Sequence, residues 1–214
     1  KNLTIKGKNG AGTDILDANS SGPNAPATTH RIFKVENGKT LTLEKLTLKN
    51  GEADKGGGIY ADTGTTVNLD ILTTIQECKA ADGGAIYNDG GTLTIKGGSV
   101  IKGNEVTNNG GAFLIKSGSL HMENNCIIEQ NKAKKGGGIY IEESASFTMQ
   151  SGNINDNKVD TGSVEDGGGV YVRGQGVGSD THASFTLNGG TINNNISGFG
   201  GGVMADAGGK FTMN

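Results

Sequence analysis

Acidic and basic side chains gather between residues 158 and 183, where they could do chemistry. They are Asp160, Glu165, Asp166, Arg173, Asp180 and His182. Two carboxylates in such a cluster could act as a general acid and base, or hold Ca²⁺. No spacing singles out a pair, however, and Asp, Gly and Ser are ordinary loop residues. With few arginines and histidines along the chain, we expect no enzyme and no metal or cofactor site.

All the tyrosines share one position, directly after a glycine run and an Ile or Val. They are Tyr60, Tyr87, Tyr140 and Tyr171. Because apolar residues flank most of them, alternation along a strand predicts that the rings point outward. An exposed file of rings would offer a stacking surface for a sugar or a partner protein, and with Arg173 and Asp180 it forms our candidate binding site. The alternative, which we favour, is that each ring covers the bare glycine backbone beside it.

The glycine runs mark a repeat, and an apolar-x-apolar triplet with a polar centre gives its register. The triplets start at Leu3, Leu41, Val67, Leu93, Leu120, Phe147, Phe185 and Phe211. Successive triplets begin 26 or 27 residues apart, apart from two longer steps of 38. Alternation with a period of two predicts a strand with one buried face.

A third marker follows each triplet, an apolar residue three positions before a turn residue. The turn residues are Gly51, Cys78, Asn104, Asn131, Asn157 and Asn195. Asn and Gly tolerate a left-handed backbone, so a corner of the fold is predicted there. We therefore interpret Asn104, Asn131, Asn157 and Asn195 as structural corner residues.

Each unit of about 26 residues then holds three short strands separated by corners. The natural partner of each strand is its copy in the next unit, about 4.8 Å away. The handedness rule for parallel crossovers favours a right-handed coil. The predicted fold is all-β, a right-handed parallel β-helix of about seven to eight turns. A chain with 39 Gly and 33% hydrophobic residues suits such a narrow, layered core.

The chain reads as a single β-helix segment over residues 1–214, with irregular loops at 19–29, 158–166 and 173–183. It ends within a repeat, so we expect it to be a fragment of a longer passenger region. The last strand would leave an unpaired edge, which invites end-to-end self-association. The net charge of −3 is nearly balanced, which argues against a nucleic-acid partner. No apolar run is long enough for membrane insertion of this segment.

The two cysteines, Cys78 and Cys126, occupy different units and different positions of the repeat. Two turns of a β-helix separate positions by about 9.6 Å, which is beyond the reach of a disulfide. We expect two free thiols.

One unit resembles a known family. The spacing of Ile128-x-x-Asn131-x-Ala133 followed by Gly136-Gly137-Gly138-Ile139 is similar to the repeats of the bacterial polymorphic outer-membrane proteins. Those repeats carry Phe-x-x-Asn and Gly-Gly-Ala-Ile/Leu/Val motifs, and Gly83-Gly84-Ala85-Ile86 matches the second motif. Ile stands in place of the family's usual Phe, which marks a divergent branch. The opening, from Leu3-Thr4-Ile5 to Leu46-Thr47-Leu48, resembles the first turns of secreted bacterial right-handed β-helices.

The resemblance implies a passenger region acting in adhesion, often exported by an autotransporter route. We expect a segment of an adhesin or stalk at the cell surface, associated with the outer membrane or secreted. It would bind a host surface protein or glycan non-covalently. The alternative is a carbohydrate-active enzyme, a polysaccharide lyase or glycoside hydrolase, on the same scaffold. A third interpretation is a structural spacer that binds nothing.

Overall fold

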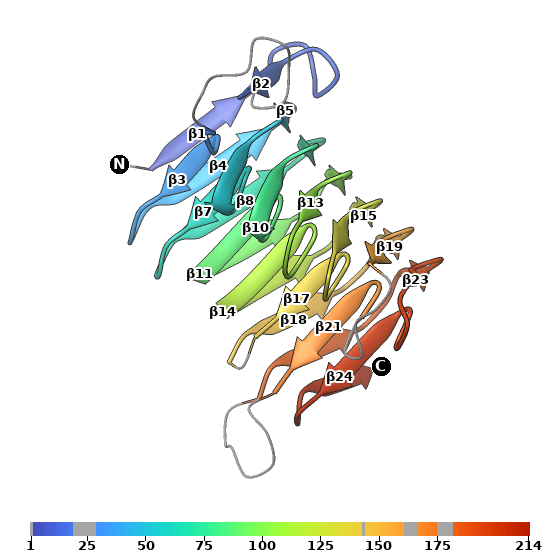
Figure 1. The fold of residues 1–214 in the computed structure, drawn as a ribbon. Helices are drawn as coiled ribbons and strands as arrows, with labels where there is room; N and C mark the ends of the chain where they lie inside the picture. Colours follow the sequence, from blue (N-terminus) through green and yellow to red (C-terminus); the bar gives the residue numbers. More distant parts are fainter. Residues whose placement is uncertain (1, 19–28, 143, 161–166, 175–181) are drawn as a thin grey trace.

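The computed structural model describes residues 2–18, 29–142, 144–160, 167–174 and 182–214. The described chain is all-β and winds as a parallel solenoid, whose turns run from the N-terminal end at the upper left of Figure 1 to the C-terminal end at the lower right. As far as the described residues go, no helix has the length and apolar character needed to span a membrane.

Three sheets run along the solenoid, and every pairing in them is parallel. The largest has 13 strands: β1 (Leu3–Lys6), β3 (Phe33–Val35), β4 (Thr40–Glu44), β7 (Ile59–Ala61), β8 (Thr66–Asp70), β11 (Ile86–Ile95), β14 (Phe113–Met122), β17 (Ile139–Ile141), β18 (Ser146–Met149), β21 (Val170–Arg173), β22 (Ser184–Leu187), β24 (Val203–Asp206) and β25 (Lys210–Met213).

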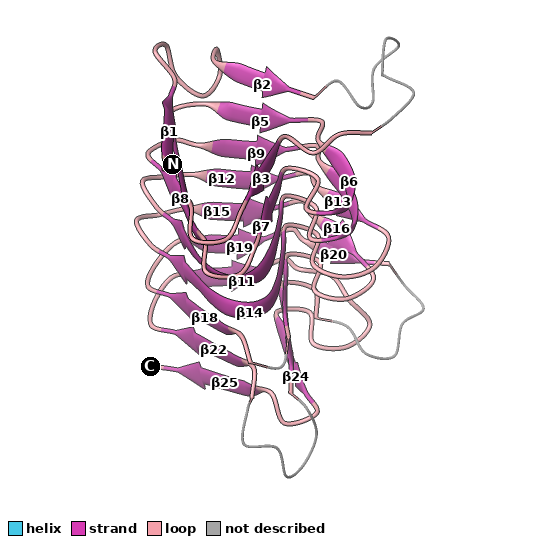
Figure 2. Cartoon of the chain, turned by 90° about the vertical axis from the view of Figure 1, so that its left-hand side faces the viewer, coloured by secondary structure: helices cyan, strands magenta, loops and turns pink. Residues whose placement is uncertain are grey.

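The seven-stranded sheet contains β2 (Ile15–Asp17), β5 (Thr47–Lys49), β9 (Thr74–Gln76), β12 (Val100–Lys102), β15 (Ile127–Glu129), β19 (Asn153–Asn155) and β23 (Thr191–Asn193). The five-stranded sheet contains β6 (Glu52–Lys55), β10 (Lys79–Asp82), β13 (Glu105–Val106), β16 (Lys132–Ala133) and β20 (Lys158–Val159). Figure 2 shows the seven-stranded sheet as a ladder from β2 to β19, beside β6, β13, β16 and β20 of the five-stranded sheet.

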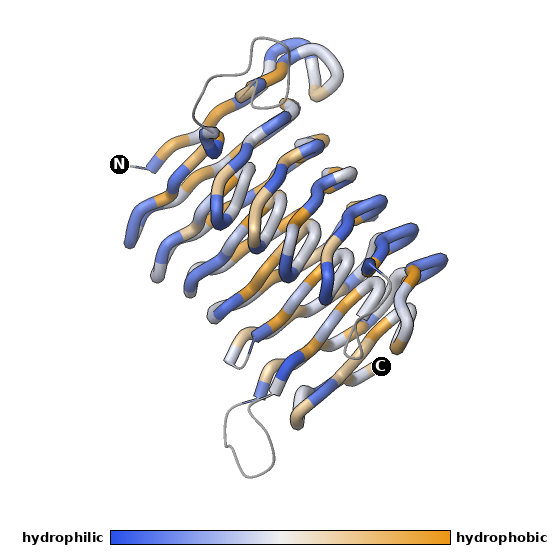
Figure 3. The backbone as a smooth tube through the Cα atoms, in the orientation of Figure 1, coloured by the Kyte–Doolittle hydropathy of each residue, from blue (hydrophilic) through white to orange (hydrophobic). Residues whose placement is uncertain are grey.

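The predicted register of the triplets is confirmed. Their first residues pair from turn to turn in one column: Leu3, Leu41, Val67, Leu93, Leu120, Phe147, Phe185 and Phe211. The inner members of this column are buried in one core that runs through the solenoid. Figure 3 agrees with this arrangement. Apolar residues recur along the strands, and polar residues lie at many of the bends.

The number of turns is smaller than predicted. The solenoid makes about six turns with a repeat of about 27 residues, where the sequence predicted seven to eight. Within the described residues, the turns of β1, β22 and β25 contribute no strand to the five-stranded sheet, so there are fewer complete turns than triplets. In two central turns the strand after the glycine run continues into the triplet strand, so that β11 and β14 are each 10 residues long.

The corner residues Asn104, Asn131, Asn157 and Asn195 do lie at bends, but the prediction that they adopt a left-handed backbone is wrong. The left-handed residue comes one position earlier. Its occupants are Asn50, Glu77, Gly103, Gln130, Asp156 and Asn194, with φ between 53° and 62°. The corner asparagines are therefore selected for their side chains and not for backbone tolerance.

Two predicted loops begin later than the sequence indicated. Lys158 and Val159 form β20 and pair with Lys132 and Ala133, and Arg173 is the last residue of β21. These residues extend the sheets before the chain leaves them. The parts of the predicted loops at 19–28, 161–166 and 175–181 lie outside the described residues.

Candidate functional site

The tyrosine file points away from the main core, as alternation predicts, and forms a second buried cluster with Leu114. The less favoured of the two interpretations, an exposed stacking surface, is wrong, because Tyr87, Tyr140 and Tyr171 are only 4%, 3% and 1% exposed. Tyr60 and Tyr87 stack with their ring centroids 5.5 Å apart, and Tyr140 and Tyr171 stack at 5.1 Å. With so little of these three rings exposed, the file packs turn on turn and does not present a platform for a sugar.

Cations cover the tyrosine rings. The Arg31 guanidinium lies 5.1 Å from the centroid of Tyr60, and Lys55 Nζ lies 4.8 Å from that of Tyr87. Such contacts are attractive because the ring face is electronegative. The Tyr60 hydroxyl also donates to Asp89 Oδ2 at 2.7 Å, and Lys116 Nζ contacts Asp89 Oδ1 at 2.7 Å. The contacts among Tyr60, Asp89 and Lys116 therefore link three successive turns on the outside of the main core.

The hydroxyls of the file resist ionisation. Burial, followed by the hydrogen bond to Asp89, raises the pKa of Tyr60 to about 12. Burial also raises the pKa of Tyr87 and of Tyr140. Burial also acts to raise the pKa of the Asp89 carboxyl, but the hydrogen bonds from Lys116 and Tyr60 outweigh it and hold that pKa below its usual range. The file therefore stays neutral at physiological pH.

This arrangement predicts alkaline destabilisation. A tyrosine in the unfolded chain ionises near pH 10. Since the folded pKa values are higher, their contribution to stability is complete below about pH 10 and is lost as the pH rises toward the folded values. We expect the urea midpoint to fall between about pH 9 and about pH 11.5. The fall should be smaller in Tyr87→Phe, which has no hydroxyl to ionise. Equal falls in the two proteins would contradict the prediction.

The corner asparagines form a ladder inside the solenoid. Asn131 Oδ1 accepts from the backbone N of Asn104 at 3.0 Å and from its Nδ2 at 2.9 Å. Asn131 Nδ2 donates to Ile101 O at 3.1 Å and to Asn157 Oδ1 at 2.9 Å. Asn157 repeats the pattern with Asn195. Because buried polar groups need partners, this ladder is structural and leaves the inner corner closed to ligands.

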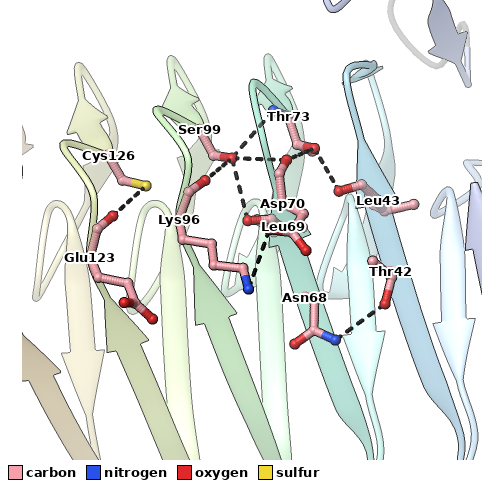
Figure 4. A network of polar contacts seen from close by, with 10 residues as sticks. All are labelled: Thr42, Leu43, Asn68, Leu69, Asp70, Thr73, Lys96, Ser99, Glu123 and Cys126. Carbon is pink, nitrogen blue, oxygen red and sulfur yellow. Dashed lines mark hydrogen bonds and ion pairs between the residues drawn. The ribbon is translucent and has the colours of Figure 1, made fainter. Parts of the chain in front are cut away.

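A second column of small polar residues closes the neighbouring corner, as Figure 4 shows. Thr73 Oγ1 donates to Leu43 O at 2.8 Å, and Ser99 Oγ donates to Lys96 O at 2.8 Å. Cys126 occupies the same position one turn later, where its thiol donates to the carbonyl oxygen of Glu123 at 3.1 Å. These side chains satisfy the turn carbonyls from within.

Both thiols are free, as predicted, and both are buried. Burial raises the pKa of Cys126 and raises that of Cys78 to about 12. A thiol that stays protonated and buried is a poor nucleophile, so neither cysteine has the character of a reactive group.

The structure describes only part of the charged cluster of the sixth repeat. Arg173 ends β21 and Asp160 follows β20, while Glu165, Asp166 and Asp180 lie outside the described residues. In the part of the chain that is described, no three His, Cys, Asp or Glu side chains lie close enough to hold a metal ion.

A groove of about 610 Å³, which was not predicted from the sequence, lies on the outer side of the five-stranded sheet. Its charged lining residues are Glu52, Asp54, Lys79, Glu105, Lys134 and Asp160. They point outward because the residues between them, such as Val106 and Val159, are buried. A signal existed in the sequence, since a charged residue directly follows five of the six corner residues: Glu52, Lys79, Glu105, Lys132 and Lys158.

Some of the groove charges are paired and others are not. Lys132 Nζ lies 3.0 Å from Glu105 Oε1 and 3.2 Å from Asp160 Oδ1, and hydrogen bonds to these two carboxylates raise the pKa of Lys132. Neither Glu52 nor Asp54 has a side-chain hydrogen bond or ion pair within the described residues. These carboxylates remain available to a ligand.

The model of the "Right handed beta helix region" family matches residues 31–214, which is well over half of the chain. No match was found among curated proteins or among solved structures. The family match agrees with the parallel pairing of all three sheets and with the continuous core. The chain belongs to the right-handed β-helix family.

Proposed function

We propose that this chain is a segment of a bacterial surface or secreted protein that binds ligands non-covalently, as an adhesin or stalk. The observation that carries the proposal is the groove over the five-stranded sheet, lined by charged side chains from successive turns. A ligand lying along it would meet one rung of the sheet after another. The Gly-Gly-Ala-Ile and Ile-x-x-Asn motifs support placing the chain near the passenger regions of the polymorphic outer-membrane proteins.

The scaffold suits a binding role at the surface. Each turn is held to the next by parallel backbone pairing in three sheets, so the outer faces keep fixed spacings. A rigid groove loses little conformational entropy when a ligand binds, which favours affinity. The expected partners are a host surface protein or a glycan.

A carbohydrate-active enzyme is the second candidate, and one observation favours it. Glu52 and Asp54 lie on the same face of β6, so their Cα atoms are separated by about 6.8 Å. Their two carboxyl groups therefore project from neighbouring outward positions, and glycoside hydrolases act through a pair of carboxyl groups. The adhesin role remains our proposal because no third group in the described groove orients these carboxylates.

The test combines binding with turnover. The protein is applied to a glycan array and to immobilised host matrix proteins, and each bound polysaccharide is then incubated with the protein and examined for new reducing ends or unsaturated products. We expect binding to at least one ligand without cleavage. Cleavage of any polymer would replace the adhesin with the enzyme, and a lack of binding on every surface would leave only the structural spacer.

A further inference from the structure

We propose that the groove over β6, β10, β13 and β16 is the ligand site, and that its occupant is an extended polysaccharide carrying free amino groups. This inference rests on the proposed binding function and adds the place and the chemistry of the ligand. It follows from the shape of the groove, the state of its charges and the backbone pairing beneath it.

The groove is long and shallow in the direction of the solenoid axis. Its lining runs from Thr29 through β6, β10 and β13 to Lys134 and Asp160, which belong to the next two turns. Four steps between β6 and β20 span about 19 Å. The floor between the charged residues is made of Ala53, Ala80 and Ala81, whose small side chains let a ligand approach the sheet closely. This shape fits a linear polymer better than a compact molecule.

The charges divide the groove into two parts. At the far end, Lys132 bridges Glu105 and Asp160 through the ion pairs described above, and Lys134 supplies a second positive charge. At the near end, the carboxylates of Glu52 and Asp54 have no such pairing within the described residues, and Lys79 is the cation in the adjacent rung. The lining therefore has an excess of acidic groups at one end, which attracts amines and repels polymers of uronic acids.

A peptide strand is the less suitable occupant. A peptide that adds to a sheet needs a free edge with unpaired backbone groups. Both edges of the five-stranded sheet are engaged: the backbone N of Glu52 donates to His30 O at 3.0 Å, and that of Val159 donates to Ile196 O at 2.8 Å. The face offers carboxylate, ammonium and hydroxyl side chains instead, which is the set that binds the hydroxyl and amino groups of sugars.

The affinity of the whole chain for the glucosamine hexamer tests this inference. Titration calorimetry at low salt and about pH 5.5 keeps the carboxylates ionised and the amines protonated. The double variant Glu52→Gln, Asp54→Asn should weaken binding at least about tenfold, because charge-assisted hydrogen bonds are lost. Ala81→Arg, which places a bulky cation in the groove, should weaken it by a similar factor. The control Glu36→Gln, Glu123→Gln removes the same charge outside the groove and should bind as the unchanged protein does.

Comparison ligands complete the test. We expect the N-acetylglucosamine hexamer to bind at least about tenfold more weakly and a galacturonate hexamer not to bind measurably. Equal binding of the acetylated hexamer would overturn the recognition of amines. Equal binding of hexalysine would overturn the choice of a polysaccharide.

Failure of the groove as the ligand site and failure of the adhesin role give different experimental results. If the protein binds glycans on the array but the groove variants bind as tightly as the unchanged protein, the groove is not the site and the adhesin role stands. If neither the array nor the matrix proteins retain the protein, the adhesin role fails as well.

Discussion

Replacing Gly111 by alanine is expected to cost at least about 3 kcal/mol of stability, because the new methyl group has no space between two turns. A Cβ at this position would lie 2.1 Å from Gly137 O and 2.7 Å from the backbone N of Lys132. Both atoms belong to the backbone of the next turn, so no side chain can rotate away. Relief requires the turns to separate, which would weaken the parallel hydrogen bonds around them.

Two other glycines separate this steric effect from backbone strain. Gly12 has open space around a Cβ, so Gly12→Ala should change stability by no more than about 0.5 kcal/mol. Gly103 also has open space but has a φ of +62°, so Gly103→Ala should cost about 1 kcal/mol from strain alone. Urea denaturation followed by circular dichroism measures all three. A Gly111→Ala protein as stable as Gly12→Ala would show that the turns are not in tight contact.

The register of the fold could be predicted from the sequence because its signal is repeated in every unit. A single alternation of apolar and polar residues predicts a strand weakly, but eight copies in phase leave few alternatives to stacked turns. Leu41, Val67 and Phe147 differ in shape and still occupy one column, because the column requires only an apolar side chain of suitable size.

The surfaces could not be predicted in the same way. Alternation places Tyr87 and Tyr171 on the outer face, but their burial depends on the neighbouring turns, Leu114 and the cations Lys55 and Lys135. Those contacts join residues that lie far apart in the sequence, so a local sequence pattern cannot predict them. The groove was missed for a related reason, since its residues are ordinary charged strand positions until several turns are stacked.

The position of the corner asparagines at bends was predicted correctly, but the physical reason for it was not. Gly51 and the asparagines share one position, which suggested a need for a left-handed backbone. The left-handed residue is in fact the preceding one, and Glu77 and Gln130 adopt it without being Gly or Asn. A side chain that bonds its own copy one turn away is visible only when the turns are superposed.

Replacing Asn131 by alanine is expected to destabilise the protein by about 3 to 5 kcal/mol, because it removes one rung from the centre of the ladder. Asn131 is fully buried, and its side chain both accepts from Asn104 and donates to Ile101 O and Asn157 Oδ1. The loss leaves the backbone N–H of Asn104 without its acceptor and Ile101 O without this donor. Burying such groups unpaired costs about 1 to 3 kcal/mol each.

The matched control is Asn155→Ala on the neighbouring strand β19. Asn155 projects from the outer face, where its Nδ2 donates to Glu129 Oε2 at 3.3 Å and to Asp156 Oδ2 at 2.9 Å in contact with water. Its loss should cost no more than about 0.5 kcal/mol. Equilibrium urea denaturation of the two variants compares an inner and an outer asparagine of adjacent turns. Similar midpoints would mean that the ladder adds nothing to stability, and the corner asparagines would then need another explanation, such as excluding alternative registers during folding.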